Sequence, residues 1–314
     1  MSVSPSYRHV LLLVAATVCW GCGTVMSKQA LDRRVAPLTL LAIELTASVI
    51  FLLLAILLLR TRLTSSPAMP VLALLGVLNP GLSYALGLLG LVSITASMSV
   101  LLWATEPILI MMLAVLVLRE RIALATTAAV ATAMVGVLLV IYRPGASGDV
   151  MGVALTVAAV SACAFYAVLT RRLLLDDSSL AVVLAQQVAA LCFAVVAAGV
   201  ASAIGAAEVG WPDDLATWAL AAASGVVYYG VAFWCFVGGL RGVPVSVAGT
   251  FLPLIPVFGL AVAHVLGDRL VDRQWIGAAL VILAAAGAAI LHLSRGSAAS
   301  PDPRRMFGGN EKSP

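Results

Sequence analysis

Two stretches of this chain share one spacing of glycine, aromatic and proline residues. They are GVLNPGLSYALGLLGLVSITASMSVLLWATEP, residues 76–107, and GVVYYGVAFWCFVGGLRGVPVSVAGTFLPLIP, residues 225–256. A shift of 149 residues aligns them without a gap. The aligned pairs are Gly76 with Gly225, Gly81 with Gly230, Tyr84 with Phe233, Gly90 with Gly239, Leu91 with Leu240, Ser97 with Ser246 and Pro107 with Pro256. This match predicts a chain built from two related halves.

The similarity continues on both sides of these stretches. After them, Glu120-Arg121-Ile122 matches Asp268-Arg269-Leu270 with a slip of one residue. Before them, a shift of 143 or 144 residues places Glu44 on Gln187 and Lys28 on Arg171 or Arg172.

The composition indicates which environment surrounds the two halves. Hydrophobic residues make up 62% of the 314 residues, charged residues make up 10%, and the mean hydropathy is +1.11. A soluble domain carries roughly 25% charged residues. So few charges cannot cover a water-facing surface, so we predict an all-α, polytopic membrane protein whose main partner is the lipid bilayer. The formal charge of +4 is too small to indicate nucleic-acid binding.

Ten segments of the chain have the length and composition of membrane-spanning helices, which need about 20 mostly apolar residues. They are residues 9–30, 38–59, 70–91, 94–118, 123–142, 151–171, 179–204, 215–240, 244–266 and 274–293. Charged residues or turn residues separate most neighbours. The weakest breaks are Val92-Ser93 and Arg241-Gly242, where we expect very tight turns.

Five spans in each half is an odd number, so the second half must insert with the opposite orientation. We therefore predict two inverted five-helix repeats, at residues 9–142 and 151–293. Residues 1–8 form a cytoplasmic N-terminus, and residues 294–314 form a disordered cytoplasmic tail rich in Gly, Ser, Pro and charge. Inverted repeats are typical of secondary transporters, whose two halves rock about a site near the bilayer midplane.

The lysine and arginine residues predict the orientation in the cytoplasmic (inner) membrane. With both termini inside, the 18 basic residues divide 12 to 6 in favour of the cytoplasmic side. The six on the opposite side are Lys28, Arg33, Arg34, Arg143, Arg269 and Arg273.

Several short motifs, taken in order on ten spans, resemble the EamA-type branch of the drug/metabolite transporter superfamily. The resemblance covers about residues 9 to 293. The motifs are Cys19-Trp20-Gly21 with Ser27-Lys28, Glu106-Pro107-Ile108 leading to Leu118-Arg119-Glu120-Arg121-Ile122, Pro253-Leu254-Ile255-Pro256-Val257 leading to Gly267-Asp268-Arg269-Leu270, and Gln274-Trp275-Ile276-Gly277.

The resemblance implies an exporter-like carrier of small metabolites or drugs, with a central cavity lined mainly by helices 1, 3, 4, 6, 8 and 9. It does not fix the cargo. The chain departs from the family pattern at Glu44, where an arginine is common, and at Asp268, where glutamate is usual.

Glu106 is the leading candidate site residue, because it lies near the middle of the predicted fourth span. An ionised carboxylate there costs roughly 2.5–3.5 kcal/mol, so it must face protein or a wet cavity, or carry a proton. Trp103 and Ser99 lie on the same helical face. Pro107 leaves the Trp103 carbonyl without its helical donor, so we expect a bend there. A structural role for Glu106, locking the bundle through a hydrogen bond, remains open.

Further candidates for substrate binding or proton coupling are scattered over other spans. They are Trp20, Tyr84, Glu44, Trp234, Pro256 and His264. Packing against helices or lipid is the simpler interpretation of each aromatic residue and of His264. Glu44 lies one to two turns inside the outer end of its span, so we expect its carboxyl to extend to water. Pro253 and Pro256 should break the ninth span as Pro107 does the fourth. The five cysteines include the pair Cys19 and Cys22, but no second pair follows at metal-site spacing, so we expect neither a metal nor a cofactor.

We expect a secondary transporter that moves a small organic metabolite or drug by alternating access, as monomer or homodimer. Export is the expected direction, and proton coupling through Glu106 is a further hypothesis. The chain has no G-x-x-x-x-G-K-[ST] run for binding ATP. The alternatives are a non-transporting membrane scaffold or receptor, and an intramembrane enzyme, for which no clustered nucleophile motif is present.

Overall fold

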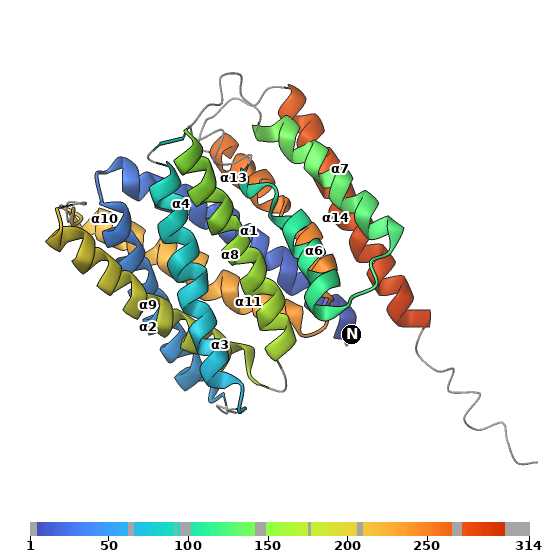
Figure 1. Ribbon diagram of the computed structural model, residues 1–314, viewed down its shortest axis with the longest axis horizontal. Helices are drawn as coiled ribbons and strands as arrows, with labels where there is room; N and C mark the ends of the chain where they lie inside the picture. The colour runs from blue at the N-terminus through green and yellow to red at the C-terminus, as the bar shows by residue number, and fades with distance from the viewer. Residues whose placement is uncertain are drawn as a thin grey trace, which may run out of the picture.

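The structure, a computed structural model, describes residues 5–61, 66–91, 93–94, 102–141, 149–174, 177–205, 210–265 and 272–298. Every regular element in these residues is a helix, and the helices form one bundle (Figure 1). Helices satisfy their own backbone hydrogen bonds, as a lipid-embedded chain requires. The Asp268-Arg269 break, Ser97, Ser99 and the tail from residue 299 lie outside the described residues.

The first half contains two continuous spans, an interrupted third span, the end of a fourth, and a fifth. In chain order the elements are α1 (Pro5–Asp32), α2 (Pro37–Leu59), α3 (Met69–Gly76), the kinked turn η1 (Val77–Leu82), α4 (Ser83–Leu91), α6 (Glu106–Leu118) and α7 (Leu124–Ile141).

The second half repeats this order. Its elements are α8 (Val150–Leu173), α9 (Ser179–Ala203), α10 (Leu215–Gly225), the π-helical turn η2 (Val226–Val231), α11 (Ala232–Leu240), α12 (Val245–Ala248), the 3₁₀ turn η3 (Gly249–Phe251), α13 (Leu254–Val265) and α14 (Asp272–Ala298). Helix α14 continues to Ala298, past the predicted end at residue 293.

Ten apolar helical segments can be counted in the described part of the chain. Eight are long enough to cross a membrane, and the shorter helices Glu106–Leu118 and Leu124–Val140 complete the set. The predicted tight turn at Arg241-Gly242 is present, where the backbone N–H of Gly242 and that of Val243 both donate to the Gly239 carbonyl at 3.1 Å. The all-helical, ten-span fold class is therefore confirmed.

Irregular turns in the helices repeat with the same offset as the sequence. The turns η1 and η2 begin and end 149 residues apart, but η1 is a kink at Asn79 whereas η2 is a π-helical turn. The third and fourth spans of each half also pack against the first span of the other half. Helices α4 and α6 contact α8, and α11 and α13 contact α1. The fifth spans of the two halves, α7 and α14, lie side by side (Figure 1). Each half therefore completes its packing on the other half.

Two matched glycines let equivalent helix pairs cross closely. A Cβ on Gly76 would lie 1.8 Å from the backbone oxygen of Gln186 on α9, and a Cβ on Gly225 would lie 2.2 Å from that of Glu44 on α2. No residue with a Cβ fits at either crossing. These crossings make Glu44 the counterpart of Gln186, one residue from the predicted counterpart Gln187.

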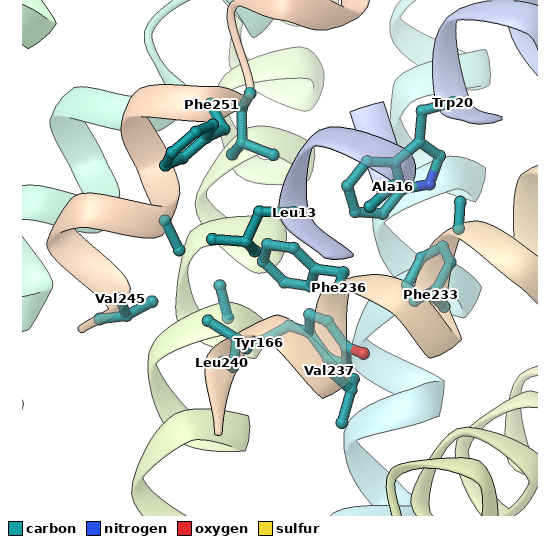
Figure 2. Packing of buried hydrophobic residues seen from close by; sticks show 14 of the residues in the cluster. Leu13, Ala16, Trp20, Tyr166, Phe233, Phe236, Val237, Leu240, Val245 and Phe251 are labelled. Atoms are coloured by element: carbon teal, nitrogen blue, oxygen red, sulfur yellow. The ribbon is translucent and has the colours of Figure 1, made fainter. Parts of the chain in front are cut away.

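Large apolar side chains pack together inside the bundle (Figure 2). Leu13 near the start of α1, Leu240 at the end of α11 and Val245 at the start of α12 extend this cluster to the end of the bundle where the N-terminus lies. Five of them are fully buried: Leu13, Tyr166, Phe233, Leu240 and Phe251. They come from α1, α8, α11 and η3, so elements of both halves close this end together. We call it the sealed end.

Candidate functional site

A cavity of about 600 Å³ lies inside the bundle, within the size range of small-molecule sites. Its walls come from spans 1, 3, 4, 6, 8 and 9, as the family resemblance implies, with Val137 of α7 added. The lining residues of the first and third spans, such as Thr24, Tyr84 and Gly87, lie in the halves of those spans away from the sealed end.

An aromatic floor separates the cavity from the sealed end. The ring of Trp20 lies 5.4 Å from that of Phe233 and 5.2 Å from that of Phe236, measured between centroids. All three residues line the cavity. Trp20 is 7% exposed, and its indole nitrogen has no hydrogen-bond partner among the described residues.

Glu106 stands at a break in the fourth span. Residues 104–105 form a turn, and α6 begins at Glu106 with Pro107 in its first turn. Proline fits this position because its missing N–H would have no helical partner there. At the proline where we predicted a bend, the span therefore contains a turn between two helical segments. The positive end of the α6 dipole lies beside the carboxylate and favours its negative charge.

The Glu106 side chain is partly exposed to the cavity. No described residue donates a hydrogen bond to its carboxyl group. The described lining residues include neither lysine, arginine nor histidine. Glu106 carries the one carboxyl group of the described cavity wall.

The ninth span is interrupted at the equivalent depth. It consists of α12, η3, a turn at Leu252 and Pro253, and α13, which carries Pro256 in its first turn. Both prolines line the cavity, and α6 contacts α12 and η3. The two broken spans, one from each half, therefore meet at the cavity. Paired breaks of this kind mark binding sites in inverted-repeat transporters.

Aromatic side chains form the wall near Glu106. The Tyr84 and Tyr228 hydroxyls are 2.5 Å apart, and the Tyr84 ring centroid lies 6.1 Å from that of Trp103. Gly87 leaves room for Trp103, because a Cβ there would come within 3.3 Å of the indole. The predicted residues Tyr84 and Trp103 are thus neighbours.

Asn79 and Cys163 belong to the cavity wall, and we did not select them from the sequence. The Asn79 Oδ1 atom accepts a hydrogen bond from Ser83 Oγ at 2.6 Å and one from Cys163 Sγ at 3.3 Å. Asn79 has non-helical φ and ψ of −149° and 123°. The Asn-Pro pair at 79–80, a turn signal within an apolar span, could have identified this position.

Glu44 does not reach the cavity wall. It is 3% exposed, and the hydroxyls of Ser27 and Ser224 lie 2.6 and 2.7 Å from its Oε1 atom. We expected this carboxyl to extend to water. Instead α1 and α10 cover it, because both helices contact α2 along this face.

Two further candidates lie elsewhere. Trp234 is partly buried and packs against the apolar core, outside the described cavity lining. His264 is exposed near the end of α13, and its ring lies 5.8 Å from that of Trp275 on α14. The structure therefore brings Trp20, Tyr84, Trp103, Glu106, Pro107 and Pro256 together and leaves Glu44, Trp234 and His264 apart from them.

The described residues hold no group of three or more His, Cys, Asp or Glu side chains able to bind a metal ion. Cys19 and Cys22 are free thiols on α1.

Comparison with known protein families gives one match for each half of the chain. A sequence model of the EamA-like transporter family matches residues 8–142 and again residues 150–290. No curated protein matches the chain closely enough to count as a relative. One solved structure, described only as a crystal structure of a protein, is similar with a TM-score of 0.77 and 20% identity, over 91% of this chain and 98% of its own. That similarity shows a shared fold. The repeated match covers most of the chain, which therefore belongs to the EamA-like transporter family, a family of membrane transporters of the drug/metabolite type.

Proposed function

We propose that the protein exports a small amphipathic organic cation across the cytoplasmic membrane by alternating access. The observation that carries this proposal is the Glu106 carboxyl, which faces a cavity of about 600 Å³ whose other described lining residues are uncharged. A carboxylate in such surroundings is costly unless an opposite charge pairs with it. A cationic cargo supplies that charge.

The wall around Glu106 suits the rest of such a cargo. The faces of Trp103, Tyr84 and Tyr228 attract a cation within about 6 Å of a ring centroid, and their edges pack against apolar groups. The Trp20 indole N–H, buried without a described partner, supplies one donor for a polar atom of the cargo. The site therefore favours a molecule with one positive charge and an aromatic or apolar body.

Alternating access is supported by the contacts that the spans of one half make with the first span of the other half. The sealed end is closed by side chains of both halves, and the broken fourth and ninth spans meet at the cavity. A rocking motion of one half against the other would open the sealed end while closing the opposite one. The distribution of basic residues supports placing the sealed end on the cytoplasmic side.

Proton coupling through Glu106 is part of the proposal. A proton and a cationic cargo each neutralise the same carboxylate, so binding of one would release the other. Replacement of Glu106 by glutamine would then abolish flux driven by a pH gradient.

The proposal predicts that Glu106→Gln weakens the binding of benzyltrimethylammonium, an aromatic cation, by about tenfold or more, since about 1.4 kcal/mol corresponds to a factor of ten. Quenching of tryptophan fluorescence in the purified protein measures this binding. Neopentylbenzene, the neutral isostere, should bind both forms alike. Asp32→Asn, which removes an exposed charge paired with Lys28, is the matched control and should change neither.

Equal affinity of Glu106→Gln and the unaltered protein for the cation would contradict the proposal. So would a preference of the unaltered protein for the neutral isostere. Metabolite accumulation compared in cells with and without the protein would then identify the natural cargo.

A further inference from the structure

Glu44, Ser27 and Ser224 form a closed ring of oxygen atoms away from the cavity wall. Ser27 Oγ lies 2.6 Å from Glu44 Oε1, Ser224 Oγ lies 2.7 Å from the same atom, and the two hydroxyls are 2.7 Å apart. All three separations have hydrogen-bond length. Glu44 is 3% exposed and Ser224 is fully buried, while Ser27 is partly exposed.

The number of protons in this ring depends on the state of the carboxyl group. Three hydrogen bonds need three protons, and the two serine hydroxyls supply two. An ionised carboxylate only accepts, so one of the three contacts would then set lone pairs of two oxygens against each other. A protonated Glu44 supplies the third proton, and each oxygen then donates once and accepts once. The Gly23 carbonyl lies 3.5 Å from Ser224 Oγ and is a further acceptor, so the ring needs a donated proton all the more.

No cationic side chain on the packed elements neutralises Glu44. Helices α2, α9 and α10 and the turn η2 contain no lysine, arginine or histidine. The titratable groups that face Glu44 are the Tyr228 and Tyr229 hydroxyls of η2, which are uncharged when protonated. On α1, Lys28 is 68% exposed and paired with Asp32.

The counterpart site in the other half carries no titratable group at this position. Gln186 accepts a hydrogen bond from Tyr166 at 2.9 Å and donates one to Thr170 at 3.4 Å. Thr170 corresponds to Ser27 with the 143-residue shift found in the sequence. A neutral amide therefore occupies the place that Glu44 holds in the first half.

The ring also joins the two halves. Glu44 and Ser27 belong to the first half, and Ser224 belongs to the second. Tyr228, one turn beyond Ser224, lines the cavity and contacts the Tyr84 hydroxyl. A change in the ring is therefore positioned to affect both the contact between the halves and the cargo wall.

We propose that Glu44, Ser27 and Ser224 form a proton-binding site, separate from the cargo cavity, that is protonated in this conformation. Loss of the proton leaves a carboxylate with only two donors and removes the proton from one contact of the ring that joins the halves. Proton release therefore favours separation of α10 from α1 and α2. This part rests on the proposed function, because it gives a transport cycle a second proton site in addition to Glu106.

Infrared difference spectroscopy of the full-length protein in bilayers tests the site without reference to any cargo. The carbonyl stretch of a protonated carboxyl group is distinct from the bands of a carboxylate. We expect a buried-acid band near neutral pH that Glu44→Gln removes and that Glu106→Gln retains. Ser27→Ala and Ser224→Ala should shift that band, and addition of benzyltrimethylammonium should leave it unchanged.

Glutamine is the matched replacement, because Gln186 already fills the equivalent position in the other half. A spectrum of Glu44→Gln with the same acid bands as the unaltered protein would overturn the proposal. The cycle is tested in proteoliposomes, where Glu44→Gln should retain downhill flux of benzyltrimethylammonium and lose acceleration by a pH gradient. Retained acceleration overturns the coupling role. If the unaltered protein moves no cation, the proposed function fails, while the infrared band still decides the proton site.

Discussion

The two intramembrane acids show how surroundings determine the use of one side chain. Glu106 stands at a helix N-terminus and faces a cavity. Glu44 is 3% exposed and lies against two hydroxyls. An open, partly exposed carboxyl can exchange partners with a solute, whereas an enclosed one exchanges only a proton. We therefore assign cargo contact to Glu106 and proton storage to Glu44 as separate proposals.

Asp214 provides a pH prediction outside the membrane spans. Its carboxylate accepts hydrogen bonds from the backbone N–H of Thr217 at 2.7 Å and from the Thr217 hydroxyl at 2.9 Å. These bonds hold the pKa of Asp214 below its ordinary value of 3.8. A lowered pKa means that the contribution to stability is present above the ordinary value and is lost as the pH falls through the lowered one.

We therefore expect Asp214→Asn to reduce the loss of thermal stability between neutral pH and a pH below that ordinary value. Asparagine retains a capping oxygen but does not titrate in this range. The unfolding temperature in detergent, followed by circular dichroism, measures the difference. Asp213→Asn, the adjacent change outside the cap, should keep the slope of the unaltered protein. An unchanged slope in Asp214→Asn would refute the assignment.

At the scale of helices, interruptions rather than continuous cylinders position the site. The fourth and ninth spans break at Glu106 and Pro253. The third span is kinked at Asn79, and the eighth carries a π-helical turn at the equivalent place, of a kind that occurs mostly at functional sites. The kink and the turn contain the cavity residues Asn79 and Tyr228. Irregular backbone at this depth is tolerated because it lines a cavity within the protein.

The crossing of α10 with α2 gives a prediction at this scale. Gly225→Ala places a Cβ 2.2 Å from the Glu44 backbone oxygen, so the helices must move apart, at a cost of about 1–3 kcal/mol. Gly199→Ala on α9 is the matched control, because nothing lies within 4 Å of that Cβ, and alanine there should stabilise the helix by about 0.5–1 kcal/mol. Denaturant unfolding in micelles measures both. Equal effects of the two substitutions would show that the crossing is loose.

Across the whole molecule, Glu120 connects the halves near the sealed end. Its carboxylate accepts hydrogen bonds from the backbone N–H groups of Val245 at 3.2 Å and Ser246 at 3.3 Å, and from the Ser246 hydroxyl. Glu120 follows α6 in the first half, and Val245 begins α12 in the second. Hydrogen bonds to a charged group contribute about 1.5–3 kcal/mol each. Their loss should favour the conformation in which this end opens.

We expect Glu120→Ala to increase the labelling rate of a cysteine placed at Leu240 by about tenfold, the change that about 1.4 kcal/mol produces. Leu240 is fully buried at the sealed end, so a water-soluble thiol reagent reaches it only after opening. The five native cysteines are replaced by alanine for this measurement. Asp32→Asn, an exposed acid at the opposite end of α1, is the control and should leave the rate unchanged. An unaltered rate in Glu120→Ala would show that these bonds do not hold the end closed.

The sequence by itself determined the solvent, the ten spans and the two-half plan. Each of these depends on local features. An apolar run fixes a span, and the aligned glycines and prolines fix the repeat, down to the equal offset of the irregular turns η1 and η2. It also singled out Glu106 and Trp103 as residues of one site. Composition and periodicity suffice here because lipid forces every backbone group into a helix.

Only the tertiary structure decided where helices break and which faces meet. The sequence could not show that α6 starts at Glu106, because a proline permits either a bend or a new helix. Nor could it separate Glu44 and Trp234 from the cavity or add Asn79 and Cys163 to it. Those outcomes depend on helix rotation and crossing, which contacts such as Gly225 against Glu44 fix only after both halves have packed together.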